Sequence, residues 1–113
     1  MLPINKRVKK DAFPEIMKKG RFLHGENLYI VSLDRKDALP SRFSFVVPAK
    51  VKKTSVGCHL IKRRLTAVVE KALTQIKPGF SAILYAKKDI SAFSYQKTEK
   101  EILELLSTLG YTH

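Results

Sequence analysis

The sequence predicts an α+β sandwich, in which helices pack against one mixed β-sheet. Two observations favour this fold class. Short apolar runs typical of strands alternate with longer segments whose apolar residues recur every three or four positions. The chain has 113 residues, of which 44% are hydrophobic, so it can bury one real core but not two. We therefore expect residues 1–113 to form a single domain.

The elements follow in a definite order along the chain. Residues 1–10 form a basic arm, and Asp11 is a candidate cap for a short helix. That helix has one apolar face, made by Phe13, Ile16 and Met17. Strands are predicted near Phe22 and over 28–33, 42–47 and 80–86.

Two longer helices complete the prediction. Thr54 or Ser55 can cap the first of them, whose apolar stripe runs from Ile61 to Ile76 with the 3.6-residue period. Ser94 can cap the second, which ends near Gly110. If the strands on either side of the first long helix are parallel neighbours, that helix is a crossover, for which the usual hand is right-handed.

The charge distribution indicates a polyanionic partner. The formal net charge is +12, and the 32 residues from 38 to 69 contain seven Lys or Arg and no Asp or Glu. Such crowding of like charge costs free energy, and nucleic acid is the commonest partner of a basic domain. The alternatives are an anionic membrane or a solvated basic face.

The strongest candidate binding residues surround the start of the first long helix. Free N–H groups and the helix dipole favour anions at such a terminus, and arginine can grip phosphate through two N–H groups. The candidates are Lys50, Lys52, Lys53, Lys62, Arg63 and Arg64. Aromatic side chains can stack on unpaired bases, and the candidates for this are Phe13, Phe22, Tyr29, Phe43 and Phe45.

Side-chain catalysis and a protein metal site are both disfavoured. Cys58 and His59 are adjacent, so on a helix their side chains diverge by about 100° and do not form a nucleophile–base pair. The histidines lack zinc-site spacing, and no glycine-rich phosphate loop is present. The single cysteine fits a reducing compartment, and no apolar run is long enough for a membrane span, so the expected location is the cytoplasm.

The segment from Val47 to Arg63, VPAKVKKTSVGCHLIKR, resembles the signature of the bacterial ribonuclease P protein component. In that family a strand ending in VP or VS precedes KKVxKRAVxRNRIKR. The matching residues are Val47, Pro48, Lys50, Val51, Lys53, Val56, Ile61, Lys62 and Arg63. NKRVKKDAFPEIMKKG near the N-terminus and SAILYAKK before the last helix resemble other family segments, so the resemblance covers nearly the whole chain.

Three positions of the family's RNR triplet depart from the pattern. Cys58, His59 and Leu60 stand there, which removes two arginines and an asparagine that are associated with contact to the catalytic RNA. The resemblance implies that His59 takes the place of the missing asparagine. Two further departures are Ala49 in place of a lysine and Thr54 in place of an arginine.

The resemblance implies a fold and a function. The fold is that of the second domain of ribosomal protein S5: a mixed four-stranded sheet, three helices and a left-handed βαβ crossover. The implied function is to bind ribonuclease P RNA and the 5′ leader of precursor tRNA, and to assist Mg²⁺-dependent removal of the leader by the RNA subunit. By the same resemblance, the protein alone is expected to have no activity, and no obligate protein partner is expected.

The family pattern assigns two groups of residues. Leader contacts are expected from Lys10, Phe13, Met17 and Phe22. RNA contacts are expected from Lys50, Lys52, Lys53, His59, Lys62, Arg63 and Arg64. The remaining alternatives are a ribosomal or assembly-type RNA-binding protein without a role in cleavage, a DNA-binding regulator and a Cys-His metalloenzyme.

Overall fold

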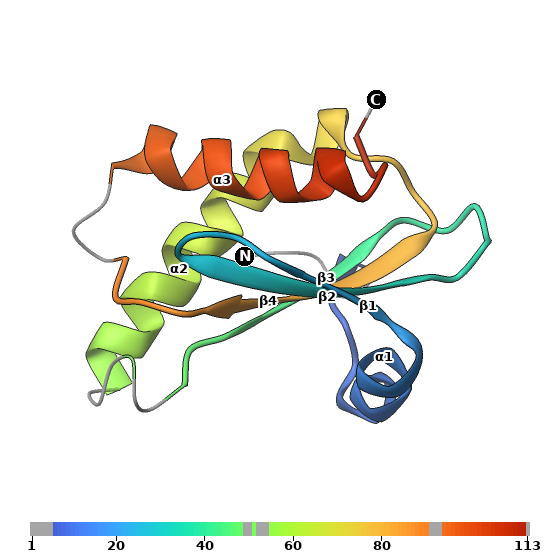
Figure 1. Cartoon of the computed structure of the whole chain (residues 1–113), viewed down its shortest axis with the longest axis horizontal. Helices are drawn as coiled ribbons and strands as arrows, with labels where there is room; N and C mark the ends of the chain where they lie inside the picture. Colours follow the sequence, from blue (N-terminus) through green and yellow to red (C-terminus); the bar gives the residue numbers. More distant parts are fainter. Residues whose placement is uncertain (1–5, 49–50, 52–54, 91–93, 113) are drawn as a thin grey trace.

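The computed structural model describes residues 6–48, 51, 55–90 and 94–112. In these residues the chain forms three α-helices and a four-stranded sheet of strand order β1-β2-β4-β3. The helices are α1 (Phe13–Lys19), α2 (Ser55–Ala72) and α3 (Tyr95–Thr108). The strands are β1 (Arg21–His24), β2 (Leu28–Asp34), β3 (Arg42–Val46) and β4 (Phe80–Ala86). Helices α2 and α3 cover one face of the sheet, and α1 lies against the other (Figure 1).

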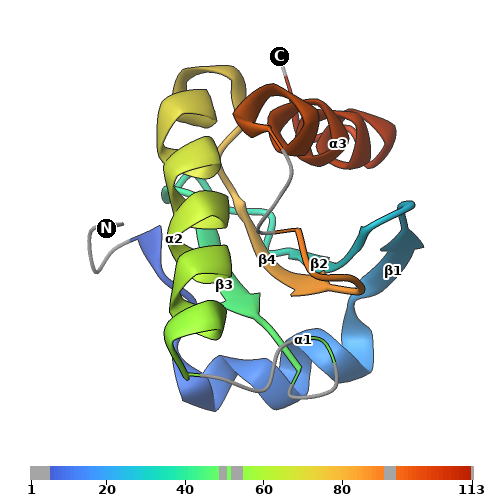
Figure 2. The same cartoon turned by 90° about the vertical axis from the view of Figure 1, so that its left-hand side faces the viewer.

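The sheet is mixed because β4 has an antiparallel neighbour on one side and a parallel neighbour on the other. It pairs with β2 in antiparallel register and with β3 in parallel register. A parallel pair needs a crossover connection, and α2 supplies it. Figure 2 views β3 from the side of α2, with β3 and β4 pointing down and β4 to the right of β3. With the strands turned to point up, β4 lies to the left, so the crossover is left-handed. This agrees with the resemblance rather than with the usual hand.

The two faces of the sheet have separate cores. On the α2–α3 side, alternate β4 residues pack against the apolar stripe of α2 in one large buried cluster that includes Phe80, Leu84, Leu65 and Val68. On the α1 side, Ile16, Val31 and Ile83 form a smaller buried cluster. Because residues of a strand alternate between faces, β4 is buried on both faces and reads as the continuous apolar run that the sequence shows.

Two boundary predictions differ from the structure. Asp11 does not cap the first helix, because a 3-10 turn, η2 (Lys10–Ala12), precedes α1 and places Asp11 inside helical backbone. Helix α2 ends at Ala72, and a second 3-10 turn, η3 (Leu73–Gln75), separates it from Ile76, which instead bridges to Thr112. The predicted cap of the last helix is confirmed, since the Ser94 hydroxyl accepts from the Lys97 N–H at 3.2 Å.

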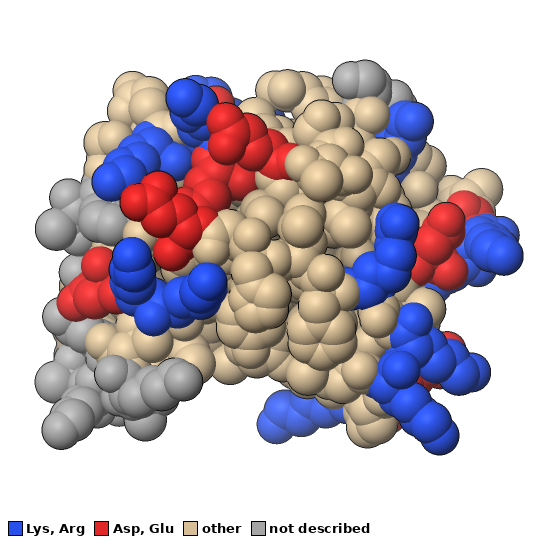
Figure 3. Space-filling model, viewed as in Figure 1, with Lys and Arg blue, Asp and Glu red and all other residues tan. Residues whose placement is uncertain are grey.

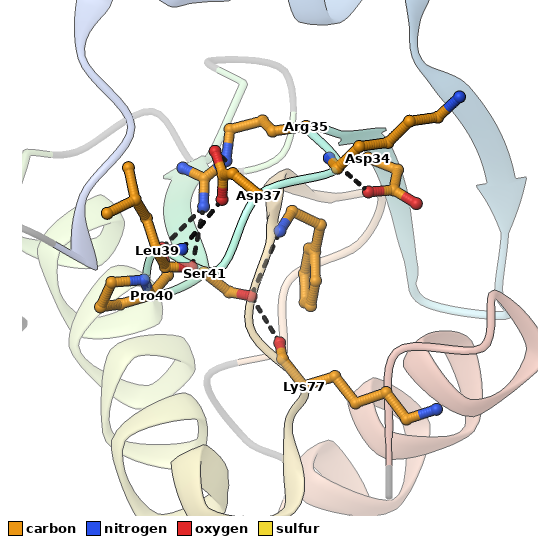
Figure 4. A network of polar contacts seen from close by, with 9 residues as sticks. Asp34, Arg35, Asp37, Leu39, Pro40, Ser41 and Lys77 are labelled. Carbon is orange, nitrogen blue, oxygen red and sulfur yellow. Dashed lines mark hydrogen bonds and ion pairs between the residues drawn. The ribbon is translucent and has the colours of Figure 1, made fainter.

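A polar network fixes the loop between β2 and β3 (Figure 4). The Arg35 guanidinium donates to the Leu39 and Pro40 carbonyls and pairs with Asp37 at 3.4 Å. Gly79 has φ +97° and donates its N–H to the Leu39 carbonyl, and a Cβ there would lie 2.5 Å from the Asp37 carbonyl oxygen. Glycine is therefore required where this loop meets the start of β4.

Glu101 ties α3 to the turn between β1 and β2. Its carboxylate accepts from the Asn27 N–H at 2.9 Å, from the Asn27 side-chain amide at 2.9 Å and from the Leu28 N–H at 2.7 Å. Gly25 lies beside it, where an added Cβ would be 2.9 Å from the carboxylate. One acid of α3 thus satisfies two backbone donors of the hairpin.

Among the described residues, no helix is long and apolar enough to cross a membrane.

Replacing Glu101 with alanine is expected to lower the free energy of unfolding by about 2–3 kcal/mol, because partly buried backbone donors lose their acceptor. The measurement is urea unfolding at neutral pH. Glu104→Ala is the matched control, since Glu104 lies on the same helix and is exposed, and it should change stability by less than about 0.5 kcal/mol. Equal losses in the two variants would contradict the role of Glu101.

Candidate nucleic-acid interface

The face of the sheet that carries α1 also carries a row of stacked rings. Strand register aligns His24 of β1 with Tyr29 of β2, and Tyr29 with Tyr85 of β4. The rings of Tyr29 and Tyr85 are parallel within 2° at a centroid distance of 4.5 Å, and His24 stacks on Tyr29 at 5.1 Å. His24 is exposed and the two tyrosines are half-buried, so this aromatic row (His24, Tyr29 and Tyr85) is open to a ligand.

Helix α1 borders the aromatic row. Met17, whose exposed fraction is 38%, receives a hydrogen bond from the Tyr85 hydroxyl to its Sδ at 3.3 Å. Phe13 is half-buried and packs on the small cluster of Ile16, Val31 and Ile83. The helix therefore presents apolar side chains to the same face as the tyrosines.

The predicted leader residues share this face. Phe22 is aligned with Val31 in the strand register, on the α1 side, and half of its surface is exposed. Lys10 is exposed in the turn before α1. The structure thus brings Phe13, Met17 and Phe22 to the face of the aromatic row and places Lys10 in the turn that leads into α1.

The environment of Tyr85 changes its acidity. Burial raises the pKa of its phenol above the ordinary value of 10.0, and the neighbouring phenol of Tyr29 raises that pKa further. The neutral phenol is therefore the form held against Met17. A neutral stacked ring suits contact with a base, because it brings no negative charge near a phosphate.

The predicted basic residues of α2 lie on a different part of the surface. His59, Lys62 and Arg63 are exposed and line a groove of about 660 Å³ between α2 and β3. Arg64 does not line it, because its guanidinium lies 3.4 Å from the Ile90 carbonyl, to which it donates. Lys50, Lys52 and Lys53 fall outside the described residues.

This groove, called the β3–α2 groove below, has mixed walls. Its complete lining is Arg7, Val8, Phe43, Ser44, Phe45, His59, Lys62, Arg63, Thr66, Ala67 and Glu70. Four of these side chains are basic and one is acidic. In the view of Figure 3, acidic side chains gather over α3. Residues 55–72, which form α2, contain one acid, Glu70.

Comparison with known proteins decides the family. The family model described as Ribonuclease P matches residues 2–110. The chain belongs to the ribonuclease P protein family. It is therefore a protein subunit of the ribonuclease P endoribonuclease, which acts in tRNA processing, and it associates with ribonuclease P RNA.

The sequences of two ribonuclease P protein components match this chain over nearly its full length. The ribonuclease P protein component of Microcystis aeruginosa is 29% identical and covers 99% of this chain and 97% of its own. That of a Synechocystis strain is also 29% identical, over 96% of this chain and 89% of its own.

Solved structures confirm the predicted fold. The ribonuclease P protein of Staphylococcus aureus superposes with a TM-score of 0.81 at 19% identity, over 96% of this chain and 98% of its own. That of Thermotoga maritima has a TM-score of 0.81 at 20% identity, over 90% of this chain and 96% of its own.

Sequence reasoning missed part of this interface. Tyr85, Arg7 and His24 are not among the binding residues that the sequence predicts. Alternation in FSAILYA does place Ser81, Ile83 and Tyr85 on one face. Without the strand register, however, nothing indicates that Tyr85 meets Tyr29.

The raised pKa of Tyr85 predicts how stability depends on pH. When the pKa of a group is higher in the folded state than in the unfolded state, the group stabilises the fold at pH values below the unfolded pKa. For a tyrosine the unfolded pKa is about 10, and the stabilisation by Tyr85 is lost as the pH rises through its higher folded pKa. Tyr85→Phe should therefore flatten the loss of stability above about pH 10, measured by urea unfolding at a series of pH values. Tyr95→Phe is the control, and an equal flattening in both would contradict the assignment.

Proposed function

We propose that this ribonuclease P protein holds the 5′ leader of precursor tRNA on the α1 side of its sheet and docks on the RNA subunit through α2. The observation that carries the proposal is the open aromatic row beside α1. Unpaired bases stack on such rings without requiring a particular sequence. A leader that varies between tRNA precursors needs this kind of recognition.

The surroundings of the aromatic row suit a single strand. Phe22 and Met17 extend the apolar surface next to the tyrosines, and both are exposed. Lys10, Lys18 and Lys19 are exposed on or just before α1 and supply charge for the phosphates. A strand lying along this surface gains stacking and ion pairing together.

Docking on the RNA subunit is assigned to the basic side of α2. His59, Lys62 and Arg63 are exposed there, and among the described residues neither Lys62 nor Arg63 has a carboxylate partner. Their charge is therefore available to RNA phosphates. Lys50, Lys52, Lys53 and Arg64 stay in the proposal as further contacts predicted from the sequence.

Catalysis is assigned to the RNA subunit. No group of three His, Cys, Asp or Glu side chains that could hold a metal ion is found in the described part of the chain. In our proposal the RNA subunit holds the Mg²⁺ ion. The protein contributes binding of the leader and orientation of the precursor.

Reconstitution tests this function. The protein is added to the ribonuclease P RNA of its own genome, and cleavage of precursor tRNA is followed at low Mg²⁺. We expect strong stimulation by the protein and no cleavage by the protein alone. Absence of stimulation would refute the proposal.

Phe22→Ala should weaken binding of precursor tRNA by about 5- to 100-fold, since one base–aromatic stack is lost. Affinity of the holoenzyme for mature tRNA, which has no leader, should stay unchanged. Leu39→Ala is the matched control, because Leu39 is as exposed as Phe22, at 54% against 50%, and lies in the β2–β3 loop. A loss that is equal for precursor and mature tRNA would argue against leader binding at Phe22.

Replacing Lys62 and Arg63 together with alanine should weaken binding to the RNA subunit and reduce the slope of log K against log salt by roughly two. The control removes the same charge elsewhere, as Lys77→Ala with Lys100→Ala; both of these residues are exposed outside α2. The measurement is a filter-binding titration at several salt concentrations. An unchanged slope would mean that Lys62 and Arg63 only face solvent.

A further inference from the structure

The β3–α2 groove lies at the open edge of the sheet. β3 is an outer strand, and the described part of the N-terminal arm meets it at one bridge, between Arg7 and Phe43. There the Val8 N–H donates to the Phe43 carbonyl at 3.0 Å. Phe45 lies two residues after Phe43 in β3, so its N–H and C=O groups point to the same outer edge of the sheet. They lie past the bridge to Arg7.

The floor of the groove is apolar. Phe45 is half-buried, with its ring between the sheet and α2, and Ala67 and Val8 add aliphatic surface. The volume of about 660 Å³ falls within the range of about 300–1,000 Å³ that is typical of small-molecule sites. One aromatic ring with aliphatic neighbours suits the flat face of a base.

The charges on the α2 wall of the groove are ordered. His59, Lys62 and Arg63 lie toward the start of α2, and Glu70 lies toward its end. Arg63 and Glu70 are seven residues apart, which is about 10 Å along a helix. A phosphate is therefore attracted to the end of the groove near Lys62 and Arg63. An attached base can then reach Ala67, which lies four residues, or about one helical turn, after Arg63.

From this arrangement we propose that the groove binds one unpaired nucleotide of the ribonuclease P RNA. The base packs on Phe45 and Ala67, and the adjoining phosphate contacts Lys62 and Arg63. Bases inside a duplex do not expose their faces, so the nucleotide is extruded from a loop or bulge. The inference rests on the proposed function and adds to it a site for a single base, on the side of the sheet away from the aromatic row.

Base-specific chemical probing of the RNA subunit, with and without the full-length protein, tests the site. We expect one unpaired nucleotide to be protected by the wild-type protein and to become reactive with Phe45→Leu, which keeps apolar volume but removes the ring. Affinity for the RNA subunit should fall about 5- to 100-fold, as for loss of one base–aromatic stack. Urea unfolding of the variant establishes that it is folded.

A second variant does not depend on the core. Ala67 is exposed, and Ala67→Glu places a carboxylate in the groove, which should expose the same nucleotide. Thr74→Glu is the matched control, because this substitution adds the same charge at an exposed residue of η3 that does not line the groove. It should leave the protection in place.

Three results would overturn the inference. The first is an unchanged footprint on the RNA subunit in both groove variants. The second is a lost protection that lies only in the leader of precursor tRNA. The third is a footprint that appears only after deletion of residues 2–5, which would make the start of the chain the occupant. In each case, stimulation of cleavage by the wild-type protein still reports separately on the proposed function.

Discussion

The parallel pairing of β3 with β4 is the constraint on which the rest of the structure depends. Parallel neighbours cannot be joined by a tight turn, so the chain must cross one face of the sheet, and α2 makes that crossing. The crossing places the basic side of α2 beside the outer edge of β3. Among the described helices, only α1 lies on the opposite face, and it is too short to cover that face.

Two surfaces of different character result from this arrangement. One is a sheet face with stacked rings, on which the spacing of side chains is set by strand register. The other is a helix side with a groove, on which basic residues and an aromatic ring face each other across a strand edge. In our proposal these two surfaces contact two RNA segments at once, because the sheet separates them.

Much of the fold could be predicted from the sequence, because its signals are local. The alternation in RFSFVV, the continuous apolar run FSAILYA and the period of α2 each reflect burial of the element itself. The hand of the crossover could not be derived in this way, since local physics favours the other hand and only the family resemblance indicated the observed one.

The candidate site was less predictable, because part of it depends on how strands far apart in the sequence are aligned. Lys62 and Arg63 could be found from charge along the chain, whereas the aromatic row depends on which residues of β1, β2 and β4 are aligned. Phe43 illustrates the opposite error: as a candidate for stacking it is wrong, because its side chain is 1% exposed and packs edge-on against Phe80 in the core.

The strand order also has a consequence for biosynthesis. β2 has β1 and β4 as its only neighbours in the sheet, and β4 is the last strand to leave the ribosome. Until residue 86 has emerged, the inner edges of β2 and β3 are unpaired, and unpaired edges invite aggregation. By then the whole of α2 has been synthesised, so its basic side can meet RNA before the sheet closes. The chain must therefore keep these two edges apart from other chains until β4 has emerged.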